Sequence, residues 1–219
     1  MRQLLLESVN IGQPSALDPA RPEKRTGICK QPVTGPVRVH RLGAEGDAVM
    51  DKKHHGGPGQ ALYLYTSQDY AFWAEQGVET GPGVFGENLT VSGIASADLC
   101  IGDRLTLGAV VLEVTSARIP CATLARRMGD PQFVKAFRDA ERPGAYLRVL
   151  AEGEIAAGQT IALTPFAGDR ISIGAHFALT FKAMKSPLPR ETIERLLALP
   201  LAERDRKDNL ERLDRYQAN

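Results

Sequence analysis

Short runs of apolar and alternating residues dominate the first two-thirds of the chain. Residues 37–42 alternate apolar with basic side chains, which is the period of a half-buried β-strand. Residues 104–107 and 110–116 are strand-like and are separated at Gly108, so they predict a β-hairpin. Further strand-like runs occupy residues 4–9, 61–65, 89–91, 144–150 and 159–163. The first part of the chain is therefore expected to be mainly β.

Helical patterns in the same region are few and short. Thr66-Ser67-Gln68-Asp69 has the chemistry of a helix start, and the helix is expected to continue to residue 76. Two more helical pieces are predicted over residues 122–128 and 132–140. Because the strands do not alternate with long helices, the pattern argues against a doubly wound parallel sheet. It favours a closed or partly closed β-barrel with helices, in the α+β class.

Near residue 166 the strand-like runs end, and a pattern of charged residues and leucines begins. Residues 191–199 and 201–216 are predicted helices whose shared apolar face comprises Leu196, Leu197, Leu199, Leu210 and Leu213. Residues 171–182 fit either a strand or a helix. The predicted organisation is a barrel domain over residues 1–166 followed by a helical segment over residues 167–219.

Net charge, apolar run lengths and cysteine usage bear on the partners and location expected for this protein. The chain has 219 residues and a formal net charge of +1, so no overall electrostatic attraction to nucleic acid or membrane is expected. No apolar run approaches the length of a membrane span, and the leucines near the N-terminus are too few for a signal-peptide core. The three cysteines form no CxxC pair, which predicts free thiols and a cytoplasmic location.

One of these cysteines, Cys121, lies between a strand-like run and a helical run, after Arg118-Ile119-Pro120. Helix N–H groups and a nearby Arg both stabilise a thiolate and lower the pKa of the thiol. Cys121 is thus a candidate reactive thiolate and Arg118 its candidate partner. The alternative is a small buried hydrophobic residue, the usual role of a free cysteine. Arg126 and Arg127 are more typical of a solvated helix face.

A second candidate stretch is the segment that contains His54-His55-Gly56-Gly57 beside two lysines. Basic side chains and exposed backbone N–H groups suit phosphate, although this window alone is more typical of a solvated turn. Residues 81–86 match GxGxxG, but a strand-like run follows them and Pro82 has no N–H, which disfavours dinucleotide binding. Lys30, framed by a Gly/Pro-rich turn, is either a surface lysine or a ligand contact.

Taken in order, several short motifs resemble the MOSC domain family, in its YiiM-like branch. The resemblance covers about residues 5–165. It is carried by Thr26-Gly27-Ile28-Cys29-Lys30, Gly35-Pro36-Val37, Asp51 with His54-His55-Gly56-Gly57, Tyr65 with Tyr70, Phe72 and Trp73, Pro82-Gly83-Val84-Phe85-Gly86-Glu87-Asn88-Leu89, Ile101-Gly102-Asp103 and Arg118-Ile119-Pro120-Cys121.

The resemblance implies a β-barrel, a small three-helix tail and a molybdopterin-type molybdenum cofactor. Cys121 would be the thiolate ligand to molybdenum and the catalytic residue, since soft thiolates suit such metals. The cofactor contacts would come from Lys30, His54, Arg118, Asn88, Gly56 and Gly57. Members of this branch reduce N-hydroxylated small molecules, including hydroxylated purine bases. Their electrons come from a partner flavin or iron–sulfur reductase.

Two other functions remain open from the sequence. The chain could be a non-catalytic carrier that delivers the cofactor, or sulfur as a Cys121 persulfide, to another protein. It could also be a β-barrel binding module with a plain buried Cys121 and no cofactor. A homodimer is compatible with each of these, and neither nucleic acid nor membrane is an expected partner.

Overall fold

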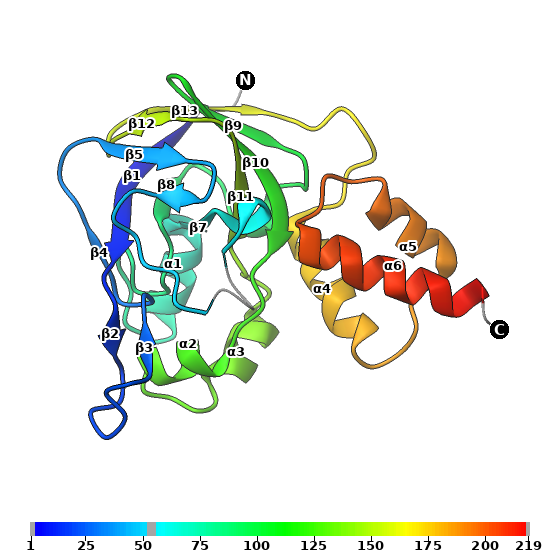
Figure 1. The fold of residues 1–219 in the computed structure, drawn as a ribbon, viewed down its shortest axis with the longest axis horizontal. Coiled ribbons are helices and arrows are strands. Elements are labelled where there is room, and N and C mark those ends of the chain that lie inside the picture. The colour runs from blue at the N-terminus through cyan, green and yellow to red at the C-terminus, as the bar shows by residue number, and fades with distance from the viewer. Residues whose placement is uncertain (1–2, 52–55, 218–219) are drawn as a thin grey trace.

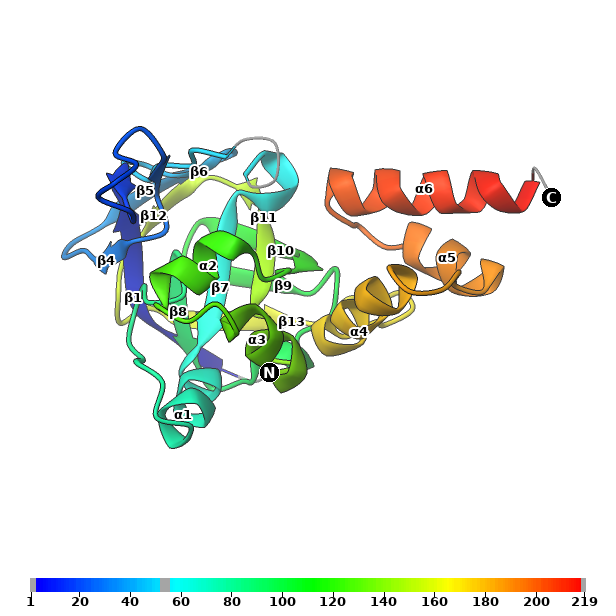
Figure 2. The same cartoon turned by 90° about the horizontal axis from the view of Figure 1, so that it is seen from below.

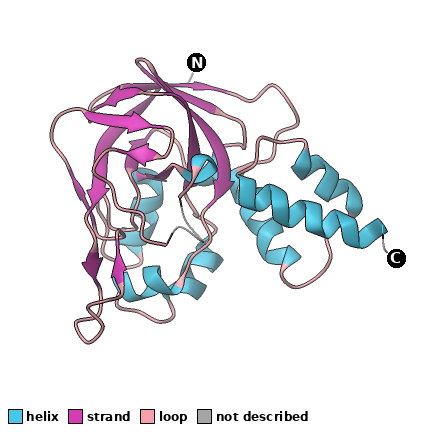
Figure 3. Ribbon diagram, viewed as in Figure 1, coloured by secondary structure: helices cyan, strands magenta, loops and turns pink. Residues whose placement is uncertain are grey.

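A computed structural model describes residues 3–51 and 56–217 of the chain, in which seven strands close into a barrel (Figures 1 and 3). The strand order is β13-β9-β10-β11-β7-β8-β1, and β13 pairs back with β1 to close it. Within residues 3–51 and 56–217, β7 and β8 are the only strands that pair in parallel. The strands are β1 (Gln3–Gly12), β7 (Leu62–Thr66), β8 (Leu89–Ser92), β9 (Arg104–Leu107), β10 (Val110–Ala117), β11 (Ala145–Ala151) and β13 (Thr160–Thr164). The barrel expected from the sequence is confirmed.

Short strands extend this barrel. β4 (Lys30–Pro32) pairs with the end of β1, so Lys30 lies opposite Gly12. β5 (Val37–His40) lies between β12 (Gly153–Ile155) and β6 (Gly43–Ala44). Residues 12–28 contain a two-residue ladder between β2 (Ser15–Ala16) and β3 (Arg25–Thr26). Pairs this short leave too little alternation to be recognised in the sequence.

Alternating burial along the strands fills the barrel. The first strand shows the pattern directly, with Leu4 and Leu6 buried and Leu5 exposed. A cluster of aromatic rings packs between the barrel and the helices α1 (Ser67–Glu75) and α3 (Phe133–Ala140), and comprises Tyr65, Tyr70, Trp73, Phe85, Phe133 and Phe137. Thr66 caps α1 by accepting a hydrogen bond from the Asp69 amide at 3.2 Å, which confirms the predicted helix start.

Three helices form the tail at one side of the barrel: α4 (Ile173–Ala183), α5 (Arg190–Leu197) and α6 (Glu203–Gln217) (Figure 2). The ambiguous stretch 171–182 is thus a helix, capped by Ser172, which accepts from the Ala175 amide at 3.1 Å. Its buried residues Ile173, His176 and Phe177 follow helical spacing, whereas a strand would have buried every second residue.

The predicted apolar face of the tail is correct only in part. Leu196 and Leu199 are buried and Leu213 is half-buried, but Leu210 is 44% exposed. The buried face of α6 passes through Asn209, and the next residue, Leu210, lies about 100° farther round the helix. No helix in the described residues is long and apolar enough to cross a membrane.

The motif Ile101-Gly102-Asp103 joins the barrel to the tail. Asp103 accepts hydrogen bonds from the amides of Cys100 and Phe166, both at 2.9 Å, and from Arg170 at 3.0 Å. Gly102 has φ +88°, and the Phe166 ring lies 2.5 Å from the place a Cβ would take. The motif therefore anchors the segment that leads into α4.

Asp103→Ala should lower the free energy of unfolding by about 2–3 kcal/mol, because it leaves buried N–H donors without an acceptor. Urea denaturation measures this. Asp169→Ala is the matched control, since Asp169 pairs with Arg195 at 2.6 Å on the exposed surface of the same region. It should change stability by no more than about 0.5 kcal/mol. Equal losses in the two variants would contradict the anchoring role.

Candidate functional site

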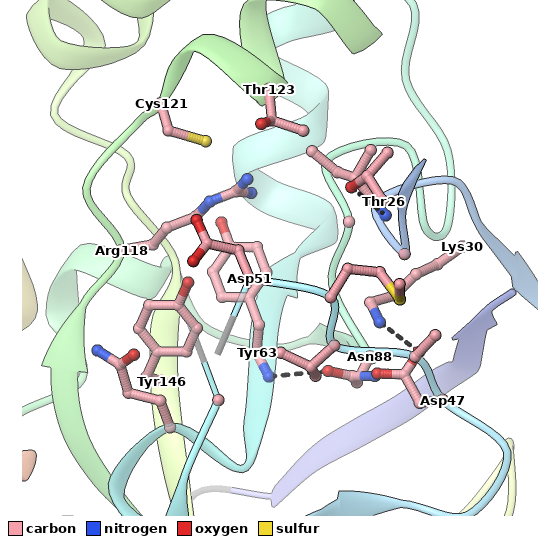
Figure 4. Close-up of a pocket in the computed structure, with 18 of the residues that line it drawn as sticks. Thr26, Lys30, Asp47, Asp51, Tyr63, Asn88, Arg118, Cys121, Thr123 and Tyr146 are labelled. Carbon is pink, nitrogen blue, oxygen red and sulfur yellow. Dashed lines mark hydrogen bonds and ion pairs between the residues drawn. The ribbon is translucent and has the colours of Figure 1, made fainter. Parts of the chain in front are cut away.

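A cavity of about 160 Å³ opens beside the end of β10 and the start of α2 (Ala122–Arg127) (Figure 4). It brings together five of the residues singled out in the sequence, which are Lys30, Gly56, Asn88, Arg118 and Cys121. Gly57 is not among the described residues that line it. His54 lies outside the described residues. Segments from four distant parts of the chain therefore meet at one place.

Arg118 is the enclosed cation of this cavity. Its side chain is 4% exposed, donates through Nη1 to the carbonyl oxygen of Phe85, and lies 4.7 Å from the ring centroid of Tyr63. Its Nε is buried and has no hydrogen-bond partner among the described residues. Buried polar atoms are nearly always paired in folded proteins, so this N–H is an open donor at the cavity wall.

Two tyrosines face the same space. Burial raises the pKa of Tyr63 and that of Tyr146 above the usual value for a phenol, so both are neutral. Tyr63 donates its hydroxyl hydrogen to the Pro143 carbonyl at 2.9 Å. The face of its ring is left for the guanidinium of Arg118, a cation–π contact that partly offsets the desolvation of the charge.

Lys30 reaches the cavity with its charge already paired. Its Nζ donates to Asp47, and both side chains are buried, at 7% and 6% exposed. Asp47 also accepts from the Gly12 amide at 2.8 Å. Burial lowers the pKa of Lys30, while the charge and hydrogen bond of Asp47 oppose this. An anion bound here would meet an ion pair rather than the free lysine expected from the sequence.

Asn88 supports the wall of the cavity. Its Nδ2 donates to Asp47 at 2.9 Å and to the Asn10 carbonyl at 3.3 Å, and its Oδ1 accepts from the Tyr63 amide at 3.1 Å. Both Nδ2 hydrogens are therefore used within the protein. Asn88 therefore holds the Asp47 side chain and the Tyr63 backbone in place.

The glycine-rich loop 81–86 packs behind Lys30. A Cβ on Gly83 would lie 2.5 Å from the Lys30 carbonyl oxygen, and one on Gly86 2.7 Å from Ile28. Glu87 is fully buried at the base of the loop and accepts from the Gly83 amide at 2.6 Å and the Tyr70 hydroxyl at 2.9 Å. Burial raises the pKa of Glu87. The loop continues into β8 and not into a helix, so it is not a dinucleotide-binding motif. Its glycines allow it to pack closely against Lys30 and Ile28.

Cys121 lies at the residue before α2 and lines the cavity with Thr123. It is only partly buried, and Figure 4 shows its sulfur directed towards the guanidinium of Arg118. All three cysteines are free thiols, as predicted. Since α2 has six residues, its dipole contributes less than the sequence pattern suggested, and the neighbouring arginine is the main cationic influence.

A wider hollow of about 530 Å³ adjoins the cavity. The two share Arg25, Thr26, Met50, Asp51 and Thr123, so they form one continuous recess. Arg21, Lys24 and Arg126 add basic side chains to the outer hollow. Among the described residues, no group of three His, Cys, Asp or Glu side chains is arranged to hold a metal.

Sequence reasoning missed Asp47, Tyr63 and Tyr146 as parts of this site. Tyr63 and Tyr146 lie in strand-like runs, where an aromatic residue usually indicates core packing. Asp47 follows Gly46 in what resembles an ordinary turn. Only the paired burial of Lys30 and Asp47 reveals its role, and no spacing in the sequence signals that pair.

Comparison with known proteins agrees with this architecture. The family model described as MOSC domain matches residues 51–162. Protein YiiM of Escherichia coli (strain K12) is 30% identical over 155 residues, which cover 68% of this chain and 69% of that protein. The crystal structure of YiiM from Geobacillus stearothermophilus has a TM-score of 0.78 and 27% identity, covering 96% of this chain and 99% of that one. The chain belongs to the MOSC domain family, and within it to the YiiM-like branch.

One further relative has a name that bears on chemistry. A protein named Reductase from Gibberella moniliformis (strain M3125 / FGSC 7600) is 36% identical over 146 residues. These cover 64% of this chain and 26% of that longer protein.

Asp47→Ala should leave Lys30 buried without its counter-ion and lower the free energy of unfolding by about 3–5 kcal/mol near pH 7. The folded state would then favour neutral lysine. The variant should therefore gain stability as pH rises from the lowered pKa of Lys30 towards the usual 10.5, where the unfolded chain still binds the proton.

Urea denaturation at about pH 7 and about pH 9.5 measures this slope. Adding Lys30→Met to the Asp47→Ala variant removes the titrating group, and the extra slope should disappear with it. A slope that persists in the double variant would show that Lys30 is not its source.

Proposed function

We propose that this chain is a molybdenum-cofactor-dependent oxidoreductase that reduces N-hydroxylated compounds, such as hydroxylated purine bases, to amines. The observation that carries the proposal is the shared cavity: a partly buried cysteine and an enclosed arginine with an open Nε donor line the same wall. MOSC domains are associated with molybdopterin binding, and the resemblance described above assigns the metal-ligand cysteine to Cys121.

The donor set fits such a cofactor. Cys121 offers a soft thiolate for molybdenum. The open Nε of Arg118 offers a charged hydrogen bond to an anionic or carbonyl oxygen. The outer hollow gives room beyond the small inner cavity. Arg21 there is paired with Asp18 at 2.8 Å, and Glu23 also lines the hollow, so Lys24, Arg25 and Arg126 are the basic side chains that a phosphate would use. Lys30 and Asn88 would act less directly, by fixing the wall that Asp47 and Tyr63 build.

When bound, the cofactor would supply two-electron chemistry at molybdenum. The overall reaction takes two electrons and two protons, breaks the N–O bond, and releases an amine and water. A partner flavin or iron–sulfur reductase would deliver the electrons. The protein's contribution is to bind and orient the reacting groups and to shield them from bulk water. Tyr63 and Tyr146, kept neutral by burial and with ring centroids 5.4 Å apart, give the cavity wall beside Arg118 an uncharged surface.

A second candidate is a non-catalytic carrier of the cofactor, or of sulfur bound to Cys121. The open recess favours it, since a bound group could be released to another protein. A binding module with a plain buried cysteine is disfavoured, because Cys121 lines the cavity. Turnover of a hydroxylamine with an artificial electron donor separates the enzyme from the carrier. The turnover assay requires protein made in a host that synthesises the cofactor.

Cys121→Ser replaces the thiol with a hydroxyl that is neutral at physiological pH. We expect the variant to fold, to lose bound molybdenum and to lose hydroxylamine reduction. Metal analysis and steady-state turnover on protein made in a cofactor-competent host measure these losses.

Cys29→Ser is the matched control, because Cys29 is adjacent to the lining residues Ile28 and Lys30 but does not line the cavity. Cys100→Ser, at the barrel–tail junction, is a second control. Both should keep metal and turnover. Unchanged molybdenum content and turnover in Cys121→Ser would reject Cys121 as the ligand.

Arg118→Ala should weaken cofactor binding by about ten- to a hundredfold, the effect of losing one charged hydrogen bond. Arg118→Lys should recover only part of this, because lysine keeps the charge but has no Nε donor in the guanidinium plane. Cofactor titration of apo-protein measures both. Arg190→Ala, which removes an exposed arginine paired with Glu194 in α5, should bind as the unmodified chain does.

A further inference from the structure

One contact between the tail and the framework of the cavity is made by a buried histidine. His176 lies in the first turns of α4, is 3% exposed, and its Nδ1 accepts a hydrogen bond from the Ala117 amide at 3.3 Å. Ala117 is the last residue of β10 and directly precedes Arg118. The tail therefore holds the backbone at the point where the strand ends and the Arg118–Cys121 segment begins.

The protonation state of His176 is fixed by its surroundings. Burial lowers the pKa of His176 to about 4, so the ring is neutral near pH 7. Because Nδ1 accepts from the backbone, the proton lies on Nε2, which faces Asp205 of α6 at 3.7 Å. Towards the barrel, His176 therefore acts as a hydrogen-bond acceptor for the Ala117 amide.

A second tail contact supports another part of the cavity wall. Arg148 donates to the Leu201 carbonyl at 3.0 Å, just before α6. A Cβ on Gly59 would lie 3.0 Å from the Cα of Ala202, so the start of α6 packs closely on the short 3₁₀ helix Pro58–Gln60. That helix leads directly to Gln60 and Ala61 of the cavity lining.

We infer that His176 is a positioning residue of the Cys121 site: by holding the Ala117 N–H, it sets the 118–121 segment so that the Arg118 guanidinium faces the Cys121 sulfur. The tail is then part of the site's framework. This inference deepens the proposed function, because it concerns how the same cavity is built. The sequence predicted a barrel domain and a separate helical segment, whereas this inference makes the helical segment part of the framework of the site.

The test uses two amide substitutions whose side chains differ by one methylene group, so their polar ends take different positions of the lost ring. In His176→Asn, the side-chain oxygen takes the place of Nδ1 and can still accept from Ala117. In His176→Gln, the polar group takes the place of Nε2, and that acceptor is lost. Both variants remove the imidazole ring from the same buried place, so each controls for the packing change in the other.

The readout is the rate at which iodoacetamide alkylates Cys121 near neutral pH, followed by site-resolved mass spectrometry. Alkylation requires the thiolate, which a facing guanidinium favours. His176→Gln should react about threefold or more slowly than the unmodified chain, and His176→Asn within about twofold of it. Molybdenum content of protein from a cofactor-competent host should follow the same order.

Equal alkylation rates in the two variants, or a faster rate in His176→Gln, would overturn the inference. Alkylation needs no cofactor, so the comparison stands even if the unmodified chain binds no molybdenum and the proposed function fails. If His176→Gln does not fold, amide exchange in the unmodified chain decides instead. The Ala117 amide must then exchange as slowly as the paired amides of β10, and exchange as fast as in exposed loops overturns the inference.

Discussion

The site depends on one buried guanidinium that is enclosed largely by neutral groups. Desolvating a cation is costly, and the partners that stabilise Arg118 are a carbonyl oxygen and an aromatic ring. Each is fixed by a different part of the fold: Phe85 by the glycine-rich loop and Glu87, Tyr63 by Asn88. The barrel, the loop and the aromatic cluster together hold a positive charge at a wall where one N–H donor remains open.

The second cation of the cavity, Lys30, is stabilised by a charged partner and not by neutral groups. Lys30 has a carboxylate partner, and Asp47 is itself held by Gly12 and Asn88. Arg118 and the Lys30–Asp47 pair therefore present one enclosed positive charge and one neutralised pair, and Arg25 and Asp51 add one charge of each sign to the lining. Such an arrangement favours a ligand that is anionic at one end and polar elsewhere over a ligand with charges along its whole length.

The sequence predicted the barrel well because strand periods and turn residues are local signals. It also placed Arg118 and Cys121, which share one short motif, beside each other. Lys30 and Asn88 were correctly placed near the cavity, but their contacts could not be foreseen, because Asp47 completes both through tertiary packing. The helix over residues 173–183 was ambiguous for the same reason: its buried face is defined by the barrel it packs against.

The His176–Asp205 pair joins helices α4 and α6. Folding lowers the pKa of His176 and raises the pKa of Asp205, so the two groups respond to acid in opposite ways. Between about pH 4 and its usual value of 6.5, His176 binds a proton only when unfolded, so acid weakens the folded state. Burial raises the pKa of Asp205 from 3.8 to about 6, so over nearly the same range acid strengthens it. The two linkages therefore oppose each other. A junction made of these two titratable side chains is thereby less sensitive to mild acidification than either group would make it alone.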